Sequence, residues 1–299
     1  MRAYFLWLFK FLTVLIVVFV LLPLVIGVIV QFGNSSSGAG LSRSKKTVSV
    51  VELTGIIRDS KDVLEDLYRE IEDPQVQGIV LRVDSPGGAV GPSQEINAAV
   101  KNLKAKKPIV ASMGAVAASG GLYATLSASK VFCQPGTMTG SIGVILEIPN
   151  FSKVTDKIGV DMVTIKSGKF KDVGNSFRPM TDEERDFLQS TVLAAYEEFV
   201  SAVADGRSID RESVKEFADG RVILGSQAKD LKLVDDFGDV VDAARAVFEL
   251  SGQALAPGEM PKLHYPADDK FEKIARALES FTNLPAIMES GPRLQYLFR

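Results

Sequence analysis

Apolar and polar positions along the chain follow two different spacings. Short, largely apolar runs are typical of buried strands, and they occur at residues 48–53, 78–83, 109–113, 131–134 and 161–165. After each of the first three runs, apolar residues recur at helical spacing. This alternation of strand and helix predicts an α/β fold whose mainly parallel sheet is covered by helices. In such folds, functional groups lie where a strand ends and a helix begins.

A longer helix is predicted after a loop at residues 167–179. Thr181 and Glu184 have the spacing of a capping box, in which each side chain bonds the other residue's backbone N–H. Apolar residues then recur at helical spacing from 187 to 203, and Gly206 follows as a helix-ending residue. The end of the chain is less regular. One short amphipathic helix is indicated there by Phe271, Ile274 and Leu278.

The N-terminal part contains an uncharged apolar run at residues 11–32. As a helix it would be about 33 Å long, enough to span a bilayer core. The run is too long for the apolar region of a cleaved signal peptide. Arg2 and Lys10 precede it and the next charge is Arg43, so the positive-inside rule places the N-terminus in the cytoplasm. We therefore expect residues 1–33 to anchor the chain in the plasma (inner) membrane, with the rest on the extracytoplasmic (periplasmic) side.

The remaining chain divides by composition into three expected parts. Small polar residues at 34–46 predict a flexible linker. Residues 47–250 carry the strand and helix signals and are expected to form one domain. Residues 251–299 are expected to be a C-terminal extension.

Charge and composition exclude several classes of function. The net charge is −3, and no basic stripe suits a phosphate backbone, so no nucleic acid partner is expected. The single histidine, His264, lies beside apolar residues and a proline, and the single cysteine, Cys133, lies in an expected buried strand. Two such residues cannot build a zinc site of the usual kind, and neither phosphate-binding glycine fingerprint is present. We therefore expect neither a metal nor a cofactor.

The candidate chemistry lies in two glycine-flanked serine motifs. Ser119 is followed by two glycines where a strand gives way to a helix, a position that can expose a nucleophilic hydroxyl. The N–H of Gly120 can face a developing oxyanion, and the glycines Gly87 and Gly88 can supply a second donor. Each motif by itself is also common in plain turns.

A base for Ser119 has to come from another residue. With the single histidine far from the glycine motifs, lysine is the other common activator of serine. The loop at 166–172 offers Lys166, Lys169 and Lys171, and chemistry alone does not choose among them. The pKa of the chosen lysine, ordinarily about 10.4, would have to fall to about 7, for which burial is the usual means. Ser141, between two glycines, is small enough to hydrogen-bond and orient a neutral lysine amine.

Taken together, these motifs resemble the bacterial signal peptide peptidase A family, whose members are serine proteases of the Clp protease and crotonase fold. The matching motifs occur in family order at residues 84–88, 118–121, 139–143, 167–172, 218–222 and 225–228. The resemblance covers about residues 48–250. It implies a Ser-Lys peptidase domain at 47–250, preceded by the single transmembrane helix. Asp84 departs from the family pattern, which more often has asparagine at this position. The departure matters little, because the expected role of this motif depends on its backbone.

The resemblance also implies the residue roles. Ser119 is then the nucleophile, Lys171 is the general base, and Ser141 orients Lys171. The backbone N–H groups of Gly120 and of Gly87 or Gly88 form the oxyanion hole.

The biological role implied by the resemblance is the degradation of remnant signal peptides after their release from secreted proteins. The substrates are signal peptides and other extended apolar peptides. Short family members are expected to form a ring, a homo-octamer, in which the lysine of one protomer completes the serine site of its neighbour.

Other functions remain open at this point. A related anchored protease could cut one specific membrane-protein partner, and the motifs do not separate this from the first reading. A crotonase-like enzyme or binder of acyl-thioesters would use the same pair of backbone donors without needing Ser119 or Lys171. A catalytically silent scaffold is disfavoured by the retained serine and lysine. Labelling of Ser119 by a fluorophosphonate probe would separate the proteases from the other two classes.

Overall fold

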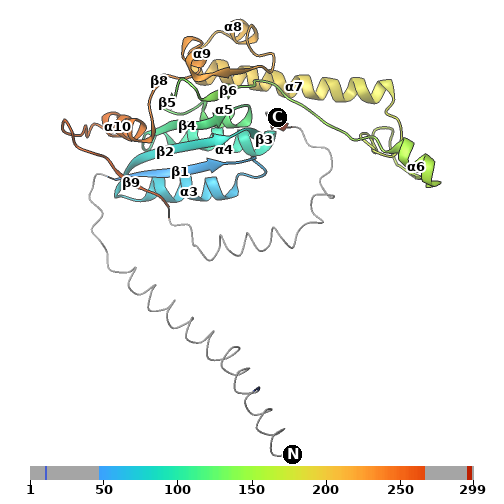
Figure 1. Ribbon diagram of the computed structural model, residues 1–299, viewed down its shortest axis with the longest axis horizontal. Coiled ribbons are helices and arrows are strands. Elements are labelled where there is room, and N and C mark those ends of the chain that lie inside the picture. The colour runs from blue at the N-terminus through green and yellow to red at the C-terminus, as the bar shows by residue number, and fades with distance from the viewer. Residues whose placement is uncertain (1–10, 12–46, 267–294, 298–299) are drawn as a thin grey trace, which may run out of the picture. The chain divides into compact units, whose positions relative to one another are not determined.

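The computed structural model describes residue 11, residues 47–266 and residues 295–297 (Figure 1). The chain divides into two units, residues 1–44 and 45–299. The expected membrane span at 11–32, apart from Phe11, and the helix expected around Phe271 lie outside the described residues. Within the part of the chain that is described, no helix is both long and apolar enough to cross a membrane.

A mainly parallel sheet forms the centre of the domain, as the sequence predicts. Strand β2 (Val76–Ser85) lies between β1 (Thr47–Thr54) and β4 (Ile109–Ala117), and all three run parallel. The remaining strands of this sheet are β5 (Lys130–Cys133), β6 (Met138–Gly140), β7 (Val222–Leu224), β8 (Asp236–Phe237) and β9 (Lys262–His264). Only β6 and β7 pair antiparallel among the described strands of this sheet. The central strands are buried on both faces, which explains their continuous apolar runs.

Helices cover both faces of this sheet. Alternating residues of β1 point to opposite sides: Val51 joins the core formed with α3 (Lys61–Glu72) and α4 (Val90–Leu103), whereas Val50 joins the core formed with α10 (Val240–Leu250). The expected apolar run at 131–134 corresponds to β5, in which Cys133 is fully buried. Both faces of β1 therefore contribute to a hydrophobic core.

Shorter elements complete the domain. They are β3 (Gly87–Ala89), α5 (Gly120–Thr125), α8 (Arg211–Lys215), α9 (Gly225–Asp230) and β10 (Gln295–Leu297). Strand β10 pairs antiparallel with β3, and β9 pairs with β1. Two segments of the expected C-terminal extension thus pack on the domain itself.

An arm extends from the sheet and consists of residues 144–193, including α6 (Ser152–Ile158) and the N-terminal half of α7 (Asp182–Arg207) (Figure 1). Helix α7 begins with the predicted capping box and ends one residue after Gly206. The strand predicted at 161–165 is wrong. This segment is irregular, and the side chains of Val163 and Ile165 are 85% and 97% exposed. An apolar run becomes a strand only where partner strands bond it, and none of the described strands does so here.

Candidate active site

Ser119 lies at the turn between β4 and α5, in a backbone conformation that serine rarely adopts. Its φ is 53° and its ψ is −115°. Its N–H donates to the carbonyl oxygen of Gly140 (2.9 Å), and its own carbonyl accepts from the N–H of Tyr123 (2.9 Å). The residue is 1% exposed, and its Oγ has no hydrogen-bond partner among the described residues. Strained backbone and an unbonded buried hydroxyl are both typical of functional sites.

The two glycine motifs meet beside Ser119. A Cβ atom on Gly120 would lie 3.1 Å from the backbone nitrogen of Gly88 and 2.5 Å from Oγ of Ser93. A Cβ atom on Gly87, whose φ is +100°, would lie 2.7 Å from the backbone nitrogen of Gly120. Side chains at these positions would collide with the opposite motif, so only glycine permits this approach. The sequence motifs at 84–88 and 118–121 therefore build one site.

Hydrogen bonds occupy backbone groups of the residues on both sides of Gly88. The N–H of Gly87 donates to Oγ of Ser85 (3.1 Å), which in turn donates to the carbonyl oxygen of Gly55 (2.6 Å). Ile57 bonds both neighbours of Gly88: its N–H donates to Gly87 and its carbonyl accepts from Ala89. Ser85 is fully buried in this role, so it is a structural hydroxyl that aligns the glycine turn.

Ser141 lies next to the same centre. Its φ is 51°, and its N–H donates to the carbonyl oxygen of Arg221 (2.7 Å). The preceding Gly140 accepts the N–H of Ser119, so Ser141 follows directly after a residue that contacts the candidate nucleophile. Asp84 lies behind the site, where its side chain accepts the N–H of Val116 (3.1 Å) and links β2 to β4.

Lys171 is the one candidate that the structure does not bring to this centre. Its loop lies on the arm beside α6, where the N–H of Phe151 donates to the carbonyl oxygen of Ser176 (2.6 Å). The ring of Phe170 stacks on that of Phe187 in α7 at 5.0 Å. Figure 1 shows α6 at the outer end of the arm, away from α5.

The three lysines of the loop differ in their partners. Lys166 is paired with Asp172, and Lys169 is paired with Glu183. Lys171 is exposed and forms no ion pair with any described residue. A carboxylate partner stabilises the charged ammonium form, which cannot accept a proton. The geometry therefore separates Lys171 from the two lysines beside it.

Arg178 attaches this loop to the start of α7. Its Nε donates to the carboxylate of Asp172 (3.0 Å), and its Nη1 donates to that of Glu184 (2.8 Å). The hydrogen bonds from Arg178 lower the pKa of Asp172, and they lower the pKa of Glu184 to about 2. Glu184 also accepts the N–H of Thr181 as part of the capping box. The sequence spacing predicted the capping box, but it did not predict that Glu184 also pairs with Arg178.

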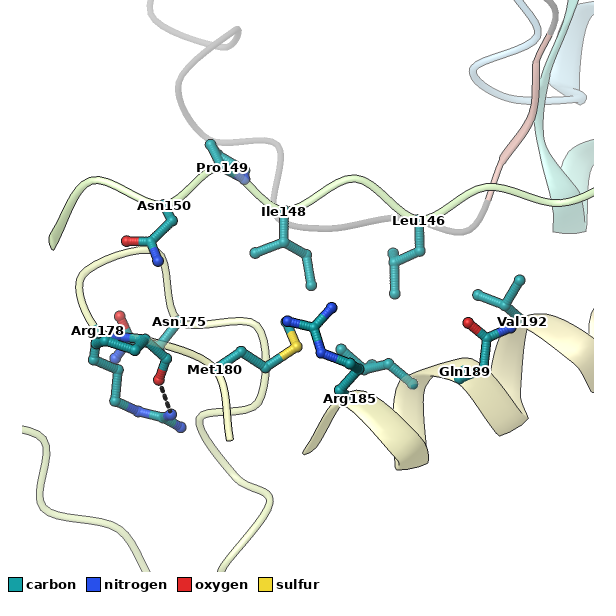
Figure 2. Close-up of a pocket in the computed structure, with 12 residues that line it drawn as sticks. Leu146, Ile148, Pro149, Asn150, Asn175, Arg178, Met180, Arg185, Gln189 and Val192 are labelled. Carbon is teal, nitrogen blue, oxygen red and sulfur yellow. Dashed lines mark hydrogen bonds between the residues drawn. The ribbon is translucent and has the colours of Figure 1, made fainter. Parts of the chain in front are cut away.

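A groove leads from Ser141 along α7 toward the arm. Its first part, about 860 Å³, is lined by Ser141, Ile142, Val144 and Tyr196, among others. Its second part, about 440 Å³, lies between residues 146–150 and α7 (Figure 2). Gln189 and Val192 line both parts. Most of the side chains along it are apolar, which suits an extended apolar ligand.

Some features near the site could not be predicted from the sequence. Tyr123, Phe199 and Tyr296 form an aromatic cluster close to the glycine turn, with ring centroids 4.5 to 5.2 Å apart. Tyr296 comes from the irregular C-terminal region, where no spacing points to it. Cys133 is no alternative nucleophile, because burial raises the pKa of its thiol to about 11. His264 lies in β9, with its Nε2 3.6 Å from Glu70, away from this site.

Comparisons with known proteins identify the relatives of this chain. The model of "Peptidase family S49" matches residues 101–253. A Synechocystis sp. protein named as a protease is 41% identical over 211 residues, which are 70% of this chain and 76% of that protein. An Enterococcus faecium protein named signal peptide peptidase SppA is 38% identical over 216 residues, 67% of this chain and 62% of that protein.

A solved structure of the membrane-bound stomatin-specific protease 1510-N has 15% sequence identity and a TM-score of 0.49, covering 76% of this chain and all of that one. The family match and the Synechocystis relative are decisive: this chain belongs to peptidase family S49 and is a serine endopeptidase.

Proposed function

We propose that the chain is a membrane-anchored endopeptidase that uses a Ser119–Lys171 dyad to degrade remnant signal peptides after their release from secreted proteins. The observation that carries this proposal is the hydroxyl of Ser119. It is buried, has no hydrogen-bond partner among the described residues, and is held at a positive φ beside converging glycine backbones. A serine held in this way is poised for nucleophilic attack rather than for structural bonding.

The oxyanion hole is assigned to the N–H groups of Gly88 and Gly120. Their backbones approach each other closely beside Ser119. The N–H of Gly87 is the weaker candidate, because it already donates to Oγ of Ser85. Two fixed donors stabilise the negative oxygen of the tetrahedral intermediate, and the loss of one costs about 3 to 4 kcal/mol in barrier height.

The general base is assigned to Lys171 of a neighbouring copy. Lys171 lies on the arm, which extends away from α5, and it is the lysine of its loop without an ion pair among the described residues. Docking of the arm on a second copy would bury the amine and favour its neutral form. Ser141, beside the Ser119 backbone, then orients that amine by a hydrogen bond.

The arm has the surface of a subunit interface. Its exposed apolar side chains are Ile145, Phe151, Val154, Ile158, Val160, Met162, Val163, Ile165, Phe177, Phe187 and Leu193. Large exposed apolar surfaces mark interaction sites in most soluble proteins. We assign it to a closed ring of identical copies, a homo-octamer, because head-to-tail contacts form a ring where their rotation closes.

The reaction follows from these assignments. Neutral Lys171 accepts the proton of Ser119 as Oγ attacks the peptide carbonyl, and Gly88 and Gly120 stabilise the oxyanion. Lys171 then passes the proton to the leaving amine. Water hydrolyses the resulting ester by the same route.

The substrate is assigned from the groove along α7. The location is assigned from the apolar N-terminal run. Signal peptide remnants are extended and apolar, and the groove along α7 is lined mainly by apolar side chains. The apolar run at 11–32 would hold the domain at the extracytoplasmic face of the membrane that these peptides leave.

The test is cleavage of a synthetic signal peptide by the full chain in detergent. Ser119→Ala and Lys171→Ala should each abolish cleavage while the circular dichroism spectrum and the assembly size stay unchanged. Lys169→Ala is the matched control and should retain activity, because Lys169 is paired with Glu183. Full activity of Lys171→Ala would refute the dyad. Labelling of Ser119 by a fluorophosphonate without signal peptide cleavage would instead indicate a dedicated protein substrate.

A further inference from the structure

The groove along α7 differs in charge between its two parts. The part that begins at Ser141 is lined by both acidic and basic side chains among its apolar ones. The far part, between residues 146–150 and α7, has Arg178 and Arg185 as its charged side chains (Figure 2). None of the described residues that line this far part is acidic. The groove is therefore cationic in the part that Ser141 does not line.

Arg185 supplies the uncompensated charge of this far part. Arg178 pairs with the carboxylates of Asp172 and Glu184, so its charge is neutralised. The guanidinium of Arg185 forms no ion pair and no hydrogen bond with any residue that the structure describes. It extends from the start of α7 toward Ile148 (Figure 2). A guanidinium beside apolar side chains is suited to bind a carboxylate through two parallel hydrogen bonds.

The part of a substrate that follows the cut bond is expected to run into this groove. The general base passes its proton to the leaving amine, so the base lies on that side of the bond. Ser141 is assigned to orient the base, and it also lines the first part of the groove. The residues released with the amine are therefore placed along α7.

The length of the groove corresponds to a short extended peptide. Tyr196 lines the part that begins at Ser141, and Arg185 lies eleven residues earlier in the same helix. This separation is about 16 Å at 1.5 Å per helical residue. An extended chain advances about 3.3 Å per residue, so about five residues cover it. A carboxylate bound to Arg185 would thus lie about five residues after the cut bond.

We propose that Arg185 binds the C-terminal carboxylate of the peptide substrate and thereby selects released signal peptide remnants over uncut precursors. The inference rests on the function proposed above and names the group by which that substrate is recognised. Hydrolysis of a precursor leaves a carboxylate at the new end of the remnant. In the precursor, the same position is a neutral peptide bond and the chain continues beyond it. Arg185 is then a specificity-determining residue.

The experiment compares two synthetic signal peptides of identical sequence, one with a free C-terminal carboxylate and one with a C-terminal amide. Mass spectrometry follows their cleavage by the full chain in detergent and gives kcat, KM and the position of the first cut. The variants are Arg185→Gln and Arg185→Lys. Arg245→Gln is the matched control, because Arg245 lies in α10 and does not line the groove. Assembly size and circular dichroism are measured for every variant.

The natural chain should cut the free acid about tenfold or more faster than the amide in kcat/KM, since a charged hydrogen-bonded pair is lost in the amide. The difference should lie mainly in KM, because the carboxylate is bound equally before and during the reaction. Arg185→Gln should cut both peptides at about the same rate. Arg185→Lys should keep part of the preference, because it retains the charge but not the paired donors. Arg245→Gln should keep the full preference.

Three outcomes would overturn the inference while leaving the proposed function in place. The natural chain could cut the acid and the amide equally well. The preference for the acid could persist in Arg185→Gln, which would assign carboxylate recognition to another residue. The assembly could dissociate in Arg185→Gln, which would assign Arg185 to the contact between copies. If the natural chain cut neither peptide and Ser119 did not react with a fluorophosphonate, the proposed function would fail together with the inference.

Discussion

Mixed assembly of two inactive variants is the sharpest test of a site shared between copies. Ser119→Ala removes the nucleophile, and Lys171→Ala removes the base. If the dyad lay within one chain, every site in a mixture would lack one of the two groups. Lys171 belongs to the arm, which extends away from α5, and this predicts the opposite. A site that takes its serine from one copy and its lysine from the next can be intact.

The expected magnitude follows from counting interfaces. With equal amounts of the two variants and random assembly, half of the sites have the natural serine, and half of those receive the natural lysine. Mixed assemblies should therefore recover about a quarter of the natural activity per site. Each variant alone should remain at background.

The assay is co-expression of the two variants with different affinity tags, followed by purification through both tags in turn. Cleavage of the synthetic signal peptide is then compared with the natural chain at equal concentration. Two differently tagged Ser119→Ala chains serve as the control for contamination. Background activity in doubly purified mixed assemblies would refute the shared site and place the base within the same chain.

Three further outcomes are expected. Gly88→Ala should destabilise the domain by about 1 to 3 kcal/mol in chemical denaturation, because its Cβ would lie 2.0 Å from a carbonyl oxygen, whereas Gly91→Ala, with open space around it, should not; equal stability of the two variants would contradict the packing. Cys133 should stay unmodified by thiol reagents at pH 8 in the folded chain and react only after denaturation, because its pKa is raised to about 11 and it is fully buried. The pKa of Glu184 is lowered from 4.5 to about 2 by Arg178, so its contribution to stability is present above pH 4.5 and lost as the pH falls toward 2; the hydrogen-exchange protection factors at the start of α7 should fall over this interval, and unchanged protection factors would contradict the pairing.

The sequence predicted the central part of the domain well, because the strands around β2 are buried on both faces and leave continuous apolar runs. The capping box at Thr181 was also readable, since it depends on two residues three positions apart. The meeting of Gly88 and Gly120 was predicted from the chemistry of the two motifs rather than from periodicity.

The remaining features depend on partners distant in the sequence. The apolar run at 161–165 has the pattern of a strand, but its side chains are exposed on the arm, since no described strand pairs with it. Strand β10 is too short to produce a pattern, and its place is set by the edge of β3. Tyr296 could not be assigned to the site from sequence, because Phe199 and Tyr123 become its neighbours only in the fold.

The carboxylate of Glu184 accepts hydrogen bonds both from the start of α7 and from the arginine that holds the preceding loop. It caps the first turn of α7 through Thr181 and, through Arg178, fixes the loop that carries Lys171. The start of a helix of 26 residues and the loop of the proposed base are therefore linked by side-chain hydrogen bonds. In a ring, a tilt of this helix in one copy would withdraw the amine from the serine of the next copy. The activity of each site would then depend on the position of α7 in the neighbouring copy. Activity would be a property of the closed assembly rather than of the single chain.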